Sequence, residues 1–154
     1  MADNQLLNDD GVGGDDIFVY TGGDQEVPRD VKRVRIAENV DIIRAQTFYE
    51  CFQLIEVEGH DKLKKIKTLA FFGCPSLRRV MNMTGVIEIL GYVFYHCNAL
   101  SDIDFDKMEI IGDCAFIDCS LRSINMPSIR RIGNSAFRYC GLTVWCLVKN
   151  WKEF

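Results

Sequence analysis

Seven cysteines and two histidines are the residues of this 154-residue chain best suited to metal binding or nucleophilic chemistry. A zinc site uses cysteines at Cys-x-x-Cys spacing, often together with histidines. The chain has no such pair, and neither His60 nor His96 stands at ligand spacing. His96 directly precedes Cys97, but a cysteine–histidine nucleophile needs both side chains turned toward one another. We therefore predict no metal, no cofactor and no catalytic residue.

Five of the cysteines recur at one position of a repeated pattern. The copies are Thr47-Phe48-x-x-Cys51, Ala70-Phe71-x-x-Cys74, Val93-Phe94-x-x-Cys97, Ala115-Phe116-x-x-Cys119 and Ala136-Phe137-x-x-Cys140. Successive Phe residues are 23, 23, 22 and 21 positions apart, a period typical of solenoids, whose units bury apolar faces by stacking. We expect these cysteines to form a buried column of free thiols, because free cysteine packs as a small hydrophobe. Cys114 and Cys146 lie outside the column and are candidates for exposure.

Aliphatic residues recur at fixed distances on both sides of this pattern. They are Ile43, Ile66, Ile89, Ile111 and Ile132 before it, and Leu54, Leu77, Leu100, Leu121 and Leu142 after it. Further on, apolar residues alternate in Val57-x-Gly59, Val80-x-Asn82, Ile103-x-Phe105 and Ile124-x-Met126. This alternation predicts one short strand per coil, with all of these residues pointing inward. The spacing of Ile66, Ala70 and Cys74 predicts a brief helical turn with a common inner face.

One stretch carries a specific family resemblance. Residues 111–127 read Ile-Gly-Asp-Cys-Ala-Phe-Ile-Asp-Cys-Ser-Leu-Arg-Ser-Ile-Asn-Met-Pro, which resembles the BspA-type leucine-rich repeat, approximately I-x-x-x-A-F-x-x-C-x-x-L-x-x-I-x-x-P. The resemblance extends over about residues 31–145 and implies a parallel-β solenoid that serves protein–protein contact, often at cell surfaces. It implies no catalytic residues. The predicted fold class is α/β to mainly β, with one short parallel strand, a second extended side and a brief helical turn per 21–23-residue coil.

Charge and composition divide the chain into four parts. Residues 1–26 contain seven acidic residues and no Lys or Arg, and the remainder carries 18 basic and 15 acidic residues, a net charge of +3. We expect a disordered acidic tail over 1–16, an N-terminal cap segment over 17–30, the repeat solenoid over 31–145, and a C-terminal tail or partial cap over 146–154.

The outward strand positions are the first candidate binding surface. In leucine-rich repeats this side is concave, and here it comprises Arg33, Arg35, Glu56, Glu58, Arg79, Met81, Asp102 and Asp104. Charge alternates from coil to coil, so an in-register stack places opposite charges on neighbouring strands. The ladder can therefore fix the strand register, recognise a polypeptide, or do both. Interposed carboxylates exclude nucleic acid, which requires a continuous basic stripe.

A second candidate surface lies on the side of the predicted helical turns. Its aromatic residues are Tyr49, Phe72, Tyr92 and Tyr95, three of which directly follow a core Phe. An exposed apolar patch of this kind marks interaction sites. The alternative is that these rings lie flat over neighbouring turns and complete the packing.

We therefore predict a non-catalytic protein-interaction module whose protein or peptide partner binds the concave face. The alternative is a self-assembling unit that stacks through its apolar C-terminal end, which includes Trp145 and Trp151. No stretch reaches the roughly 18 apolar residues of a membrane span. The odd cysteine count and the acidic start Met1-Ala2-Asp3-Asn4 favour an intracellular location, although proteins with similar repeats are often found at surfaces.

Overall fold

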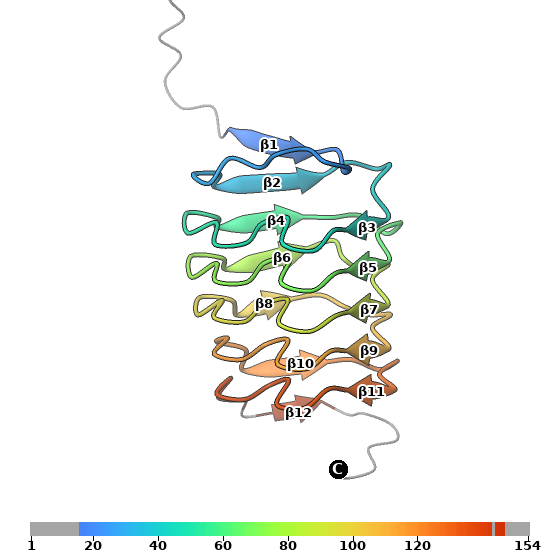
Figure 1. The fold of residues 1–154 in the computed structure, drawn as a ribbon. Coiled ribbons are helices and arrows are strands. Elements are labelled where there is room, and N and C mark those ends of the chain that lie inside the picture. Colours follow the sequence, from blue (N-terminus) through green and yellow to red (C-terminus); the bar gives the residue numbers. More distant parts are fainter. Residues whose placement is uncertain (1–15, 143, 147–154) are drawn as a thin grey trace, which may run out of the picture.

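The computed structural model describes residues 16–142 and 144–146 and is a β-solenoid built from short parallel strands. Figure 1 shows the coils stacked in one column, with the chain running from the β1 end to the β12 end. The strands are β1 (Ile17–Tyr20), β2 (Arg33–Ile36), β3 (Ile42–Ile43), β4 (Glu56–Glu58), β5 (Lys65–Ile66), β6 (Arg79–Met81), β7 (Glu88–Ile89), β8 (Asp102–Ile103), β9 (Ile110–Ile111), β10 (Ser123–Asn125), β11 (Arg131–Ile132) and β12 (Val144–Cys146).

The strands form two long parallel sheets on different sides of the column (Figure 1). The first sheet has the order β1-β2-β4-β6-β8, and the second has the order β11-β9-β7-β5-β3. Equivalent repeat positions pair in register, for example Val34 with Val57 and Val57 with Val80. The sequence prediction of one strand and a second extended side per coil is thus confirmed, and the second side is itself a sheet.

The core is a ladder of stacked phenylalanines. Phe48, Phe71, Phe94 and Phe116 are fully buried, and neighbouring ring centroids lie 4.9 to 5.3 Å apart with nearly parallel planes. Tyr20 of β1 closes the ladder at one end, with its ring edge-on to Phe48 at 5.5 Å. Each coil therefore buries its Phe mainly against the Phe of the next coil, which explains why a single repeat has no core of its own.

The repeated cysteines form a second buried column beside the phenylalanines, as predicted. Four of the five thiols donate a hydrogen bond to the carbonyl oxygen of the Phe of the preceding coil. The pairs are Cys74 to Phe48, Cys97 to Phe71, Cys119 to Phe94 and Cys140 to Phe116, at 2.7 to 3.2 Å. Cysteine is small enough for the interior and still supplies a second donor to the Phe carbonyls, most of which also accept the backbone N–H of the Cys in their own turn. The cysteine column is thus structural, and its thiols also donate hydrogen bonds to the backbone.

The prediction of a brief helical turn is wrong about the backbone geometry, but it is correct about which residues face the core. Among residues 16–142 and 144–146 no helix is present, and the segment around each core Phe is a succession of tight turns. The residues two positions before and two after every core Phe have left-handed φ angles. They are Gln46, Glu50, Leu69, Gly73, Tyr92, His96, Cys114, Asp118, Ser135 and Tyr139. A right-handed helix cannot contain such residues, whereas paired turns still aim Phe and Cys at the core.

The first sheet is interrupted toward its C-terminal end. Strands β8 and β10 are not paired, and β10 instead forms a two-stranded sheet with β12, in which Ile124 pairs with Trp145 as the repeat pattern predicts. The second sheet continues through the same coils. There the two shortened coils approach closely at Gly112 and Gly133, where an added Cβ would lie 2.4 Å from the backbone of the preceding coil. The second sheet is thus continuous through the shortened coils, and the break lies in the first sheet.

One inward assignment at the end of a strand is wrong. Asn82 is exposed with a φ of 56°, and the following Met83 takes the buried position. The left-handed residue rotates the chain by one position, and asparagine adopts this conformation more readily than most residues.

The two ends of the chain are described only in part. Strand β1, within the predicted cap segment, pairs with β2 and buries Tyr20. The predicted acidic tail, apart from Asp16, and the predicted C-terminal segment after Cys146 lie outside the described residues. No helix in the described part of the chain has the length and apolar character of a membrane span.

Candidate functional site

The outward residues of the first sheet lie on one surface, as the repeat spacing predicts. Strand register places Arg33, Glu56, Arg79 and Asp102 in one row, and Arg35, Glu58 and Met81 in a second row. Asp104 follows β8 directly and is exposed. We call these eight residues the outer face. Because each residue is fixed by a paired strand, the face is a rigid display of side chains.

Two ion pairs neutralise the central part of the outer face. Arg35 Nε lies 2.9 Å from Glu58 Oε2, and Arg79 Nη2 lies 2.8 Å from Glu56 Oε2. Asn82 also donates a hydrogen bond to Glu58 Oε1 at 3.2 Å. The predicted attraction between neighbouring strands is therefore present. Pairs this exposed contribute less than about 1 kcal/mol each to stability.

The β8 end of the outer face carries uncompensated negative charge. Asp102 and Asp104 form no ion pair within the described residues, because Arg79, the in-register neighbour of Asp102, is engaged by Glu56. Burial raises the pKa of the Asp104 carboxyl above its ordinary value, and the nearby carboxylates of Asp106 and Asp102 raise it further. A hollow of about 220 Å³ opens here between β8 and β10, lined by these aspartates, Ser123 and Asn125 among others.

Two exposed apolar residues extend the outer face at its opposite end. Ile17 pairs in register with Arg33 and Val19 with Arg35, and they are 41% and 44% exposed. Residues 17–20 were predicted to belong to the cap segment, and the predicted surface did not include them. Their alternation in a short β-type run was the signal that could have extended the surface by one strand.

The aromatic residues of the second candidate surface stack mainly on one another. Tyr49, Phe72 and Tyr95 form a ladder with centroids 5.1 Å apart and nearly parallel rings, and all three are half-buried. Tyr92 is 42% exposed and packs at a tilt on Tyr95. Ring faces used for stacking are closed to a ligand, so this surface offers mostly ring edges and Tyr92.

His96 and Cys97 point to opposite sides of the chain. Cys97 is fully buried with its thiol on the Phe71 carbonyl, whereas His96 is outside and its Nδ1 lies 2.8 Å from Asp118 Oδ2. The two side chains do not form a nucleophile pair. Among the described residues, no group of three His, Cys, Asp or Glu side chains is arranged to hold a metal ion.

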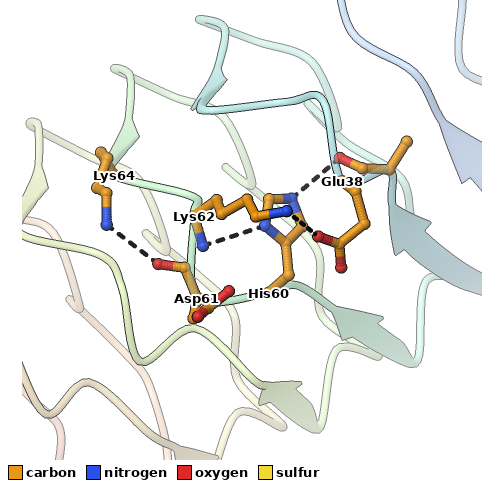
Figure 2. Close-up of polar contacts among 6 residues, drawn as sticks. Glu38, His60, Asp61, Lys62 and Lys64 are labelled. Carbon is orange, nitrogen blue, oxygen red and sulfur yellow. Dashed lines mark hydrogen bonds and ion pairs between the residues drawn. The ribbon is translucent and has the colours of Figure 1, made fainter.

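His60 is the one buried polar side chain of the described residues, and it links two coils. Figure 2 shows its ring between Glu38 and Asp61, with Nε2 on the carbonyl oxygen of Ala37 at 2.9 Å and Nδ1 accepting from the Lys62 backbone N–H at 3.2 Å. Lys62 Nζ also lies 3.0 Å from Glu38 Oε2. Both ring nitrogens are occupied by backbone groups, so this cluster secures the connection between coils and has no nitrogen left for a ligand.

Comparison with known proteins places this architecture. A family model described as the BspA type leucine rich repeat region matches residues 28–143 in six copies. No curated protein matches the chain.

Solved structures of bacterial leucine-rich repeat proteins share the fold. A leucine-rich repeat protein of T. pallidum is 30% identical with a TM-score of 0.68, and the match covers 73% of this chain and 56% of that one. A leucine-rich repeat protein of Bacteroides ovatus is 27% identical with a TM-score of 0.64, covering 69% of this chain and 28% of that one. A leucine rich cell surface protein of Faecalibacterium prausnitzii is 25% identical with a TM-score of 0.52, covering 75% and 38%. The chain thus spans less than two thirds of each of these proteins.

Proposed function

Because the chain belongs to the BspA-type leucine-rich repeat family, we propose that it is a non-catalytic protein-interaction module whose protein or peptide partner binds the outer face of the first sheet. The observation that supports this most is the distribution of charge over that face. Its centre is neutralised by two ion pairs, while Asp102 and Asp104 at one end form no ion pair with any residue that the structure describes. Uncompensated charge on a rigid surface gives a partner both attraction and orientation.

Two features support the choice of a polypeptide as the partner. The face combines exposed apolar side chains at β1 with paired charges at its centre and carboxylates at β8, a mixture typical of protein interfaces. Carboxylates interposed between the arginines disfavour nucleic acid, whose phosphates need a continuous basic stripe.

Affinity capture from extract of the source cell, with mass spectrometry, tests this function. One bait is the natural chain and another carries Glu56→Ala, Arg79→Ala and Asp102→Ala. A matched control carries Lys67→Ala, Asp41→Ala and Asp61→Ala, which remove the same charges from the side of the second sheet. All three baits must show the same thermal unfolding midpoint.

A protein recovered by the natural chain and the control, and lost from the outer-face variant, is the expected result. Its direct binding is then measured with purified components. Equal recovery by all three baits would contradict binding at the outer face and direct attention to the aromatic ladder and Tyr92.

Self-association through the C-terminal end is the alternative function. Residues 147–154 lie outside the described residues, so this remains a prediction from sequence. Sedimentation velocity over a concentration series tests it. Self-association requires that the apparent mass rises with concentration, and that Trp145→Ala and Trp151→Ala substitutions abolish this rise. The intracellular location also remains a prediction, which fractionation of the source cell tests.

A further inference from the structure

One edge of the first sheet carries a further surface, separate from the outer face and from the aromatic ladder, with a different chemistry. The residue just before each of its strands belongs to a column that includes Lys32, Ile55 and Arg78. Backbone hydrogen bonds join successive members, from Ile55 N to Lys32 O at 2.7 Å and from Arg78 N to Ile55 O at 2.8 Å. The column is therefore as rigid as the sheet, and it lies on the side of the stack from which β4 and β6 start (Figure 1).

A groove follows this column. A hollow of about 420 Å³ is lined by Lys32, Gln53, Ile55, Pro75, Ser76, Arg78 and Ala99. A second hollow, of about 820 Å³, shares Lys32 and Ile55 with the first and continues toward β1. We call the first hollow the edge groove. Its floor is apolar through Ile55, Pro75 and Ala99, and its polar lining is dominated by two cations.

The two cations of the edge groove form no ion pair within the described residues. Lys32 and Arg78 are exposed, and no carboxylate lines the groove itself, whereas Asp16 and Asp30 line the adjoining hollow toward β1. Arg79 directly follows Arg78, and Arg35 lies three positions after Lys32. Both arginines are paired with a glutamate. Arg35 and Arg79 therefore neutralise charges of their own sheet, whereas Lys32 and Arg78 are available to another molecule.

The spacing of the cations indicates what fits between them. Lys32 and Arg78 are two coils apart, or about 10 Å at the usual strand spacing. An extended peptide in the polyproline II conformation has three residues per turn and rises about 3.1 Å per residue, so carboxylates three positions apart lie on the same face about 9 Å from one another. The residues between them lie over Ile55, where an apolar side chain is favoured. Two isolated cations over an apolar floor suit a peptide of this kind better than a phosphate backbone.

We propose that the edge groove is a docking site for an extended acidic segment of a partner protein, with carboxylates at Lys32 and Arg78 and an apolar side chain over Ile55. This surface is separate from the outer face, so one partner can use both surfaces or two partners can use one each.

Fluorescence anisotropy with short labelled peptides tests the groove directly. The probe is fluorescein-Gly-Glu-Leu-Leu-Glu-Gly, and the two comparison peptides replace both Glu residues with Gln or with Lys. The acidic peptide is expected to bind at least about tenfold more tightly than either comparison peptide, and to weaken with added salt.

Charge reversal in the groove supplies the matched variants. Lys32→Glu with Arg78→Glu is expected to reduce affinity for the acidic probe by at least about tenfold and to favour the Lys peptide. Lys67→Glu with Lys107→Glu changes the net charge equally at other exposed sites and is expected to leave binding intact. Ile55→Thr, which keeps both cations, is expected to weaken the acidic probe while the salt dependence persists.

Three results would overturn the proposal. Equal binding of the acidic and Gln peptides would remove the role of charge, and equal loss in both charge-reversed variants would indicate a non-specific field. Binding only to a chain lacking residues 1–15, which carry four aspartates and no Lys or Arg, would make that segment the occupant in place of a partner. Outer-face variants leave this assay unchanged, so it fails or succeeds independently of the function proposed above.

Discussion

The interior of the solenoid and the outer face of its first sheet are built from the same coils, yet they follow different rules. Inside, each coil repeats one arrangement, a stacked Phe with a Cys thiol on the neighbouring Phe carbonyl. On the outer face the charge alternates from β2 to β8, but the ion pairs end before β8.

This difference separates the residues that hold the fold together from those that we propose bind a partner. The inner columns bury large apolar groups and satisfy backbone carbonyls, which are the terms that hold a repeat stack together. The outer face contributes little to stability, because its ion pairs are exposed to solvent. Variation there costs the fold little, so this is where a repeat protein can acquire a partner.

The largest expected effect is the loss of one ring from the Phe ladder. Phe71→Ala removes a fully buried ring stacked between Phe48 and Phe94, and should lower the free energy of unfolding by about 3–5 kcal/mol. Chemical denaturation with a fluorescence readout measures this. A loss below 1 kcal/mol would break the comparison, because the interior would then be as tolerant as the surface.

Removal of the buried histidine should have the next largest effect. His60→Ala leaves the Ala37 carbonyl and the Lys62 N–H without their partner and should destabilise the fold by about 1–3 kcal/mol. The exposed His96→Ala, measured in the same denaturation series, is the control and is expected to change stability by less than about 0.5 kcal/mol.

The cysteine column should make the fold sensitive to alkaline pH. Burial, and after it the nearby Cys74 thiol, raises the pKa of the Cys51 thiol to about 11. A folded-state pKa above the unfolded value of about 8.5 means that stability is full below that pH and falls as the pH rises toward 11. Urea midpoints between pH 7 and 10.5 should show this fall, and Cys51→Ala should make it shallower. A midpoint that stays constant to pH 10.5 would contradict the burial of these thiols.

The smallest expected effect concerns the ion pairs of the outer face. A double-mutant cycle on Arg79 and Glu56 should give a coupling free energy below about 1 kcal/mol that declines in 1 M salt. A coupling above 2 kcal/mol would mean that the outer face also holds the stack together, and the division between stability and recognition would fail.

The buried columns and the outward rows could be predicted from the sequence because the repeat shows each of their positions several times. The burial of Phe and Cys, the register of Val34, Val57 and Val80, and the row of outward charges all follow from spacing alone. Features that occur in one coil were missed, because no repetition marks them. The left-handed Asn82, the break between β8 and β10 and the buried His60 belong to this class.

The turn geometry was missed for a different reason. Spacing of four fits a helical turn as well as two successive tight turns, and only the φ angles distinguish them. Leu69, Tyr92 and Cys114 are poor markers of a left-handed backbone, so their residue types gave no warning.

The most direct test of this account is the affinity of a captured partner for the chain and for its Glu56→Ala, Arg79→Ala, Asp102→Ala variant, measured by calorimetry beside their unfolding midpoints. The account predicts an affinity at least about tenfold weaker at an almost unchanged midpoint, since rigid outer-face charges recognise the partner and buried rings hold the fold. Unchanged affinity, or a loss of affinity that only follows unfolding, would contradict it.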